Sequence, residues 1–282
     1  MKKLGVLVAV LLAFACAKRM EKKANVSQLR VSILDCGQVL VRDISIFSPG
    51  VDKGKAKTLT DSCYLIEHPK GRMIWDTGLN DALLQKPKGQ DVWDGKFNLS
   101  VKRGLRNQLK QLGLTPKDID LVGISHFHMD HVGNAALFNT ATVLVQKDEQ
   151  ATALAADAVK KGMDAGFVSW FKTAKVTALE GDYDVFGDGT VVIKRTPGHT
   201  PGHQSLFLNL PKTGPVLLTG DLYHFTKNRQ FKRVPSFNTD KKATLKSMKE
   251  FEAFAKAKKA QVWIQHDLEQ NQTLAHAPGF FE

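Results

Sequence analysis

The segment 125–131, SHFHMDH, concentrates side chains that bind metal ions. It holds three of the nine histidines of the 282-residue chain, together with one aspartate. His126 and His128 lie two apart, so in an extended segment they share one side, and Asp130 and His131 lie at the far end of the same loop. Imidazole and carboxylate suit zinc or a similar first-row divalent ion better than calcium or copper(I). The spacing predicts two adjacent cations.

Further donors follow other apolar runs of the chain. His199 and His203 lie in TPGHTPGH (196–203), Asp221 ends the run in LLTGDLYH, and His266 ends VWIQHD. Loops at strand ends are common places for functional sites, and a carboxylate such as Asp221 can bridge two cations. His203 precedes the apolar run QSLFL and is interpreted as a structural histidine. The predicted metal ligands are therefore His126, His128, Asp130, His131, His199, Asp221 and His266.

Apolar runs alternate with glycine-bearing turns along the chain. Strands are expected at 29–37, 62–71, 72–78, 119–125, 141–146, 189–196, 203–210, 214–220 and 260–267. Apolar residues at helical spacing predict helices within 100–113 and 147–162, and a longer one after Thr239-Asp240 with Leu245, Met248 and Ala255 on one face. This order predicts two packed sheets covered by helices. The chain contains no proline- or serine-rich linker, so a single domain is predicted over residues 28–282.

The first residues have the pattern of an export signal. MKK is followed by LGVLVAVLLAFACA, an apolar run that ends in small residues and is shorter than the ~20 residues needed to span a bilayer. Residues 1–17 are therefore predicted to be a signal peptide. The protein is expected to be exported, as a periplasmic, secreted or outer-surface lipoprotein form. Cys16 follows an Ala-Phe-Ala site and is the candidate for lipidation, although a lipoprotein signal usually has leucine where Ala13 stands.

Cysteine content and net charge restrict the state of the cysteines and the partners that the protein can have. Cys36 and Cys63 each lie in an apolar strand-like run, and free buried cysteines are expected there, although export permits a disulfide. The formal net charge of +12 comes from basic residues spread along the chain. No nucleic-acid-binding module accompanies them, so a solvated cationic surface is predicted rather than a nucleic-acid partner. Membrane contact is expected only through an N-terminal lipid anchor.

The order of these motifs resembles the metallo-β-lactamase superfamily. H-x-H-x-D-H is followed by a P-G-H turn, a G-D at a strand end and a late strand-end histidine. Within the superfamily the chain resembles the quorum-quenching N-acyl-homoserine lactonases, from about residue 30 to 270. The stretches that carry this closer resemblance are EGDYDV (180–185), TPGHTPGHQSLFL (196–208) and HDLEQ (266–270).

The resemblance implies an α/β fold, a four-layer αββα sandwich, with two divalent metal ions at one edge, zinc being expected. His126, His128 and His199 would hold one ion, and Asp130, His131 and His266 the other, with Asp221 between them. The family usually has a tyrosine three residues after the bridging aspartate, as a donor to the substrate carbonyl. Here that position is His224, and Tyr223 precedes it. His224 is the favoured donor, and a bulge that brings in Tyr223 is the alternative.

The implied reaction is metal-dependent opening of a lactone ring in a small-molecule substrate. A pair of divalent cations lowers the pKa of a shared water from 15.7 to about 7, and Asp130 is the expected proton shuttle to the leaving oxygen. Trp93, Phe97, Phe225 and Phe237 are candidates for an apolar acyl-chain groove, with a core role equally expected for each. The alternatives are a thioester, organophosphate or β-lactam hydrolase of the same fold, or a non-catalytic exported metal- or ligand-binding protein.

Overall fold

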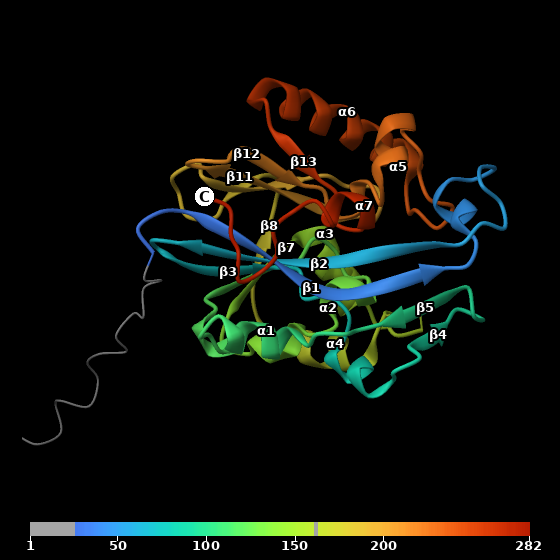
Figure 1. Cartoon of the computed structure of the whole chain (residues 1–282), viewed down its shortest axis with the longest axis horizontal. Coiled ribbons are helices and arrows are strands. Elements are labelled where there is room, and N and C mark those ends of the chain that lie inside the picture. Colours follow the sequence, from blue (N-terminus) through green and yellow to red (C-terminus); the bar gives the residue numbers. More distant parts are fainter. Residues whose placement is uncertain (1–25, 161–162) are drawn as a thin grey trace, which may run out of the picture.

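Two β-sheets pack face to face, and helices cover both outer faces (Figure 1). This computed structural model describes residues 26–160 and 163–282, so the predicted signal peptide lies outside the described residues. The larger sheet has eight strands in the order β4-β5-β1-β2-β3-β6-β7-β8, and the smaller has five in the order β13-β12-β11-β10-β9. The αββα sandwich expected from the sequence is confirmed.

The larger sheet contains β1 (Arg30–Val41), β2 (Lys57–His68), β3 (Gly71–Trp75), β4 (Gln90–Val92), β5 (Phe97–Ser100), β6 (Leu121–Gly123), β7 (Thr142–Gln146) and β8 (Lys175–Leu179). The smaller sheet contains β9 (Tyr183–Asp184), β10 (Val191–Arg195), β11 (Gln204–Leu210), β12 (Gly214–Leu218) and β13 (Gln261–Trp263). The α-helices are α1 (Leu105–Gln111), α2 (Met129–Val132), α3 (Lys147–Leu154), α4 (Ala165–Phe171), α5 (Thr226–Phe231), α6 (Lys241–Lys258) and α7 (Leu268–Asn271). Short 3-10 helices lie at Ile44–Phe47, Asp81–Gln85, Pro116–Asp118, Ala135–Phe138 and Gly220–Leu222.

Alternating side chains of the strands build separate apolar layers. On β1, Val31 and Ile33 join the cluster between the two sheets, whereas Leu34 packs in the cluster under α1 and α4. Successive side chains of a strand point to opposite faces, so one apolar strand can serve both layers. A third cluster joins the outer face of the smaller sheet to α6. These three layers explain why the strands of both sheets are apolar on both faces.

The helices agree with the sequence in position more than in length. Helix α6 begins after the Asp240 side chain accepts a hydrogen bond from the Ala243 N–H, and it buries Met248 and Ala255, whereas Leu245 is exposed. The helix expected within 147–162 is shorter than predicted, because α3 ends at Leu154. In the described part of the chain, no helix is long and apolar enough to cross a bilayer.

Strand direction brings the ends of five strands to one edge. β3 and β6 are parallel, and β12 and β13 are parallel. β10 runs in the same direction as β12, because both are antiparallel to β11 between them. The loops that follow these strands therefore meet at the edge where the two sheets adjoin, and they contain all of the predicted metal ligands.

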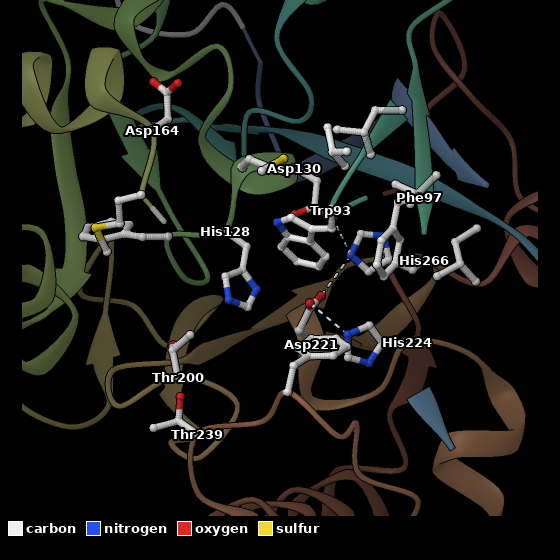
Figure 2. Close-up of a pocket in the computed structure, with 18 of the residues that line it drawn as sticks. Trp93, Phe97, His128, Asp130, Asp164, Thr200, Asp221, His224, Thr239 and His266 are labelled. Atoms are coloured by element: carbon white, nitrogen blue, oxygen red, sulfur yellow. Dashed lines mark ion pairs between the residues drawn. The ribbon is translucent and has the colours of Figure 1, made fainter. Parts of the chain in front are cut away.

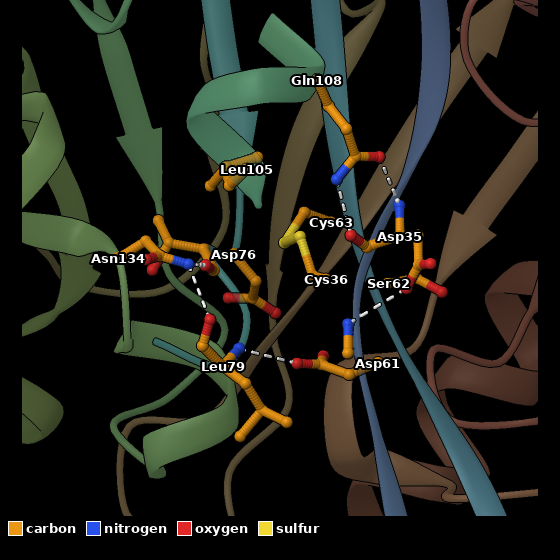
Figure 3. Close-up of a disulfide and its surroundings, with 12 residues drawn as sticks. Asp35, Cys36, Asp61, Ser62, Cys63, Asp76, Leu79, Leu105, Gln108 and Asn134 are labelled. Atoms are coloured by element: carbon orange, nitrogen blue, oxygen red, sulfur yellow. Dashed lines mark hydrogen bonds between the residues drawn. A yellow bond between two sulfur atoms is a disulfide. The ribbon is translucent and has the colours of Figure 1, made fainter. Parts of the chain in front are cut away.

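Cys36 and Cys63 form a disulfide, so the expectation of free cysteines was wrong (Figure 3). The two residues lie on β1 and β2, which pair antiparallel with a register shift between Asp35 and Gly37. This irregularity brings Cys36 close to Cys63 on the adjacent strand. The Cα–Cα distance is 5.8 Å, which a disulfide can span. Both side chains are buried in the layer beneath α1.

Candidate metal centre

All seven predicted ligands lie at the shared edge of the two sheets. His126 and His128 follow β6, and the short helix α2 that comes next contains Asp130 and His131. The other three follow strands of the smaller sheet, His199 after β10, Asp221 after β12 and His266 after β13. Their side-chain donors form two groups, His126, His128, His199 and Asp221 in one and Asp130, His131 and His266 in the other.

The first group is centred on three imidazole nitrogens. His126 Nε2 lies 2.9 Å from His128 Nδ1, and His199 Nε2 lies 3.2 Å from the former and 3.1 Å from the latter. A neutral imidazole has only one N–H, and the other nitrogen of His126 already faces the Ser125 hydroxyl at 3.0 Å. Hydrogen bonds among these rings therefore cannot satisfy all three contacts.

The second group is joined to the first by Asp221. His131 Nε2 and His266 Nε2 lie 3.3 Å apart, and Asp221 Oδ1 lies 3.3 Å and 2.9 Å from them. The other oxygen, Oδ2, lies 3.2 Å from His199 Nε2 and 3.5 Å from His126 Nε2. Asp130 approaches the second group at 3.8–3.9 Å. The two oxygens of one carboxylate thus face two different sets of nitrogens.

This donor set fits a pair of first-row divalent ions. A tetrahedral zinc ion with Zn–N bonds of about 2.0–2.1 Å holds its nitrogens about 3.3 Å apart. The histidine nitrogens of both groups lie at 2.9–3.3 Å from one another, close to that spacing. Nitrogen and carboxylate donors without thiolate match zinc, and the same donor set also suits other first-row ions.

Asp76 orients the second group from behind. It follows β3, and its Oδ2 lies 2.9 Å from His131 Nδ1, so that His131 directs Nε2 toward Asp221. The same oxygen accepts a hydrogen bond from Gln265 Nε2 at 2.9 Å, and Oδ1 accepts one from the Ser125 N–H at 2.6 Å. Carboxylates that bind the second nitrogen of a ligand histidine fix its tautomer and ring orientation.

Two further contacts orient the smaller-sheet ligands. His266 directs Nδ1 to the Thr60 carbonyl at 2.8 Å, which leaves Nε2 for the metal centre. His203 Nε2 accepts a hydrogen bond from the Asp221 N–H at 2.9 Å, and its Nδ1 lies 3.0 Å from the Thr196 carbonyl. His203 therefore supports the bridging aspartate from behind and contributes no donor to either group.

Burial and nearby charges determine the protonation states of His126, His128 and Asp221 in the first group. Burial lowers the pKa of His126 well below its usual value and the pKa of His128 to about 3, so both are neutral donors. Burial also opposes ionisation of Asp221, but His224, His266 and His131 outweigh it and hold the pKa of Asp221 well below its usual value. The Asp221 carboxylate is therefore ionised at neutral pH, the form in which a carboxylate binds metal ions.

His224 and Tyr223 point in different directions. His224 Nε2 lies 3.0 Å from Asp221 Oδ2, and the ring packs on Phe47 with 4.5 Å between centroids. The Tyr223 hydroxyl instead donates to Glu252 at 3.0 Å, beneath α6. The short 3-10 helix that holds Asp221 ends at Leu222, and the next residues are extended, so adjacent side chains diverge. No bulge brings Tyr223 to the centre.

A cavity of ≈ 360 Å³ opens beside the donors (Figure 2). His128, Asp130, Asp221, His224 and His266 form its polar side. Most of the remaining wall is apolar and comes from Val39, Phe47, Leu59, Val92, Trp93, Phe97, Leu99, Phe127, Met129, Ala158, Met163, Pro201 and Phe237. Trp93, Phe97 and Phe237 thus lie where the sequence suggested, whereas Phe225 is buried in the cluster behind the cavity. The volume suits a small amphiphilic molecule.

Comparisons with known proteins agree with this geometry. The profile of the metallo-beta-lactamase superfamily matches residues 58–258. N-acyl homoserine lactonase AttM of Azorhizobium caulinodans is 33% identical over 229 residues, which cover 78% of this chain and 86% of that protein. N-acyl homoserine lactonase AiiA of Bacillus thuringiensis subsp. kurstaki is 30% identical over 249 residues, 84% of this chain and 93% of that one. The chain belongs to the N-acyl homoserine lactonase family of the metallo-beta-lactamase superfamily.

Solved structures of lactonases share the fold of this family member. An N-acyl homoserine lactone hydrolase with the product N-hexanoyl-L-homoserine at its catalytic metal centre superposes with a TM-score of 0.79. It is 27% identical, and the match covers 90% of this chain and all of that one. AidC, a dizinc quorum-quenching lactonase, has the same fold at 17% identity and a TM-score of 0.66, over 93% of this chain and 96% of AidC. The resemblance to N-acyl homoserine lactonases that the sequence motifs indicate is confirmed.

Several residues that shape this lactonase-type centre have no sequence signature. Gln265 helps to orient His131 through Asp76, and the Thr60 carbonyl orients His266. Glu149, on α3, forms hydrogen bonds with the loops that hold the first group. Their partners are distant in sequence, 51 residues for Glu149 and Thr200 and 206 for Thr60 and His266. The one available signal was position, since Gln265 directly precedes a predicted ligand.

Proposed function

We propose that this protein hydrolyses the lactone ring of N-acyl homoserine lactones with two divalent cations, zinc being the expected metal. The observation that carries the proposal is the pair of donor groups joined by Asp221 at the polar side of an apolar cavity. The lactonase relatives cover most of this chain and support the same substrate class. The reaction ends quorum signalling by converting a cyclic signal into an open-chain acyl homoserine.

The proposed first ion is held by His126, His128 and His199, and the second by Asp130, His131 and His266, with Asp221 shared. When bound, two divalent cations supply Lewis acidity toward a carbonyl oxygen and make water a nucleophile at neutral pH. The contribution of the chain is to hold its donors in place before the substrate arrives. Asp76, Thr60 and His203 do so through the hydrogen bonds described above.

Ring opening adds a water oxygen to the lactone carbonyl carbon and breaks the bond from that carbon to the ring oxygen. The ring oxygen must gain a proton to leave as a hydroxyl group, and water must lose one. Asp130 is suited to carry this proton because its side chain is 22% exposed and lines the cavity, whereas that of Asp221 is 4% exposed. A positioned carboxylate that reaches both the substrate and solvent can act first as base and then as acid.

His224 is proposed as the residue that contacts the lactone, in place of Tyr223. It lines the cavity beside Asp221, and burial lowers its pKa to about 4, so the ring is neutral at pH 7. A neutral imidazole has a single N–H, which lies against Asp221 Oδ2 here and would be free to donate to the lactone when both Asp221 oxygens bind metal ions. The Tyr223 hydroxyl is engaged with Glu252 on the far side of the strand end.

The apolar wall is proposed to receive the acyl chain. Trp93 packs edge-on against Phe97 with 4.9 Å between ring centroids, and Phe237 packs against Phe47 at 5.2 Å. Phe47 and Phe237 pack beside His224, and all four rings line the same cavity as the proposed metal ligands, so a lactone at the metal centre would extend its chain along them. Each methylene buried there contributes roughly 0.8 kcal/mol, which favours medium or long chains over short ones.

Export to an oxidising compartment is part of the proposal. The sequence predicts an export signal at residues 1–17, with Cys16 as the candidate for a lipid anchor. The Cys36–Cys63 disulfide supports this location, because disulfides persist in exported proteins and are rare in a reducing cytosol. Mass spectrometry of the mature N-terminus, in the membrane and soluble fractions, tests both cleavage and lipidation.

The test of function is a substrate panel with and without chelator. Purified protein is assayed on N-acyl homoserine lactones of increasing chain length, a thioester, a phosphotriester and a β-lactam. We expect ring-opened acyl homoserine as the main product, loss of turnover after metal removal and recovery when zinc is returned. Equal or faster turnover of another substrate class would contradict the proposal, and chelator-resistant turnover would exclude the metal centre as its cause.

A further inference from the structure

We infer that Glu149 is a positioning residue of the metal centre, whose carboxylate ties together the two loops that carry His126, His128 and His199. Glu149 lies in the first turn of α3, outside every ligand motif. It is 1% exposed, and no step of the reaction described above uses it. Three hydrogen bonds connect it to those two loops.

The first bond joins Glu149 to the loop after β6. Its Oε1 accepts a hydrogen bond from the Phe127 N–H at 2.9 Å. Phe127 is the residue between His126 and His128, so this bond fixes the peptide that links the two ligands. The Phe127 side chain is itself packed between Phe167 and Phe171 of α4 at 4.9 Å from each ring centroid. The backbone of the ligand pair is thus held by the carboxylate on one side and by apolar packing on the other.

The other two bonds join Glu149 to the turn after β10. Its Oε2 accepts from the Thr200 hydroxyl at 2.7 Å and from the Gly202 N–H at 3.0 Å. Thr200 directly follows His199, the third ligand of the first group. The helix and the turn touch closely here, because a Cβ atom at Gly202 would lie 2.3 Å from the Glu149 nitrogen. One carboxylate therefore spans both loops whose nitrogens converge within 3.2 Å.

A carboxylate is the group that this position requires. All three partners are donors, so two acceptor oxygens satisfy them, whereas an amide would place its own N–H2 against at least one donor. Burial raises the pKa of Glu149, and the hydrogen bonds from Thr200, Phe127 and Gly202 act in the opposite direction. A buried carboxylate surrounded by donors holds its neighbours in one geometry, since each unpaired donor would be costly.

The effect should be confined to the first ion. His131 and His266 of the second group are oriented by Asp76 and Thr60, through hydrogen bonds in which Glu149 takes no part. Loss of the three bonds would let the loops of the first group move apart while the second group keeps its supports. Substitutions behind metal ligands typically lower metal affinity by about 10- to 100-fold.

The experiment measures zinc content across graded concentrations of a chelator, so it does not depend on which substrate the enzyme uses. His128→Ala and His266→Ala proteins identify the steps that belong to the first and second ion. We expect the Glu149→Gln protein to lose the zinc ion of the first group at a chelator concentration about 10-fold or more lower than the one that removes it from wild-type protein. The second equivalent should leave within about twofold of the wild-type concentration. A scan of thermal unfolding on metal-free protein separates this effect from a general loss of stability.

Matched variants control the result. Asp148→Asn alters the neighbouring first-turn residue, whose side chain is 53% exposed and paired with Arg195, and neither step should change. Should Glu149→Gln fail to fold, Thr200→Val removes one of the three bonds at nearly constant shape, and Thr200→Ser keeps it. The valine variant should lower the affinity of the first group for its ion, and the serine variant should not. Both steps shifting together, or neither shifting, would overturn the inference.

Discussion

Replacing both Cys36 and Cys63 by alanine is expected to lower the free energy of unfolding by about 3.5 kcal/mol. The disulfide closes a segment of 27 residues. A cross-link of that span removes about 12 cal/mol/K of entropy from the unfolded chain, which is about 3.5 kcal/mol at 25 °C. Because whole domains are stabilised by only about 5–15 kcal/mol, this is a large fraction of the total. For a chain of this length the melting temperature should fall by about 6–7 °C.

The assay is denaturant unfolding of metal-saturated wild type and variant, followed by tryptophan fluorescence and circular dichroism. Wild-type protein unfolded and refolded in a thiol reductant serves as the control, because it loses the cross-link but keeps both sulfur atoms. Reduced wild type and the double variant should agree within about 1 kcal/mol, the remaining difference being the packing of two buried sulfurs. A larger gap would assign the effect to packing instead.

Two results would refute the reasoning. One is a double variant as stable as oxidised wild type, since the closed segment would then contribute nothing. The other is alkylation of Cys36 and Cys63 in native protein without reductant, which would show that the two thiols are free. Native protein should also resist added reductant until it unfolds, because the two side chains are at most 2% exposed.

The disulfide also bears on the metal centre, through the segment from Asp76 to Leu79 (Figure 3). A Cβ atom at Gly78 would lie 2.2 Å from the Cys36 Cβ, so this segment rests directly on the cross-link. On its other side the Thr77 N–H donates to the His131 carbonyl at 2.8 Å. Asp76 is therefore held between the disulfide and the ligand loop that it orients.

Three further predictions concern the centre and its cavity. His224→Ala should lower kcat about 100-fold or more if the ring contacts the developing negative charge, whereas Tyr223→Phe should change kcat less than about twofold, as stopped-flow or product assays would show. Phe237→Ala should reduce kcat/KM about 10- to 100-fold for long acyl chains and much less for short ones, measured across a chain-length series. Gly133→Ala should cost about 1–3 kcal/mol in thermal unfolding, because a Cβ there would lie 2.4 Å from the Asn80 nitrogen.

The predicted donor set could be proposed from the sequence because its members lie in the segments that follow apolar runs. Strands end where apolar runs end, and parallel strands place their ends at one edge. His126, Asp221 and His266 could therefore be assigned to one site without knowledge of the sheet order. The layered fold followed from the same runs, since apolar residues on both sides of a strand predict burial between two layers.

The remaining features depend on contacts that a local pattern does not contain. The disulfide required that β1 pair with β2, and that the register shift after Asp35 bring Cys36 beside Cys63. The shorter helix α3 could not be foreseen either, since apolar residues continue at helical spacing beyond Leu154 while the backbone leaves the helix there. Glu149 resembles any charged residue in the first turn of a helix until its distant partners are known.

Different residues support the two donor groups, so the two halves of the metal centre are held separately. Asp76 and Gln265 hold the second group against the larger sheet and the disulfide, whereas Glu149 holds the first group from α3. Asp221 and the Ser125 hydroxyl each contact both groups, and the backbone of Asp221 is fixed by His203. A change behind one group should therefore reach the other only through these two shared residues, so paired substitutions of Glu149 and Gln265 should have nearly additive effects on metal affinity. Strong coupling between them would mean that the two ions are held as one unit.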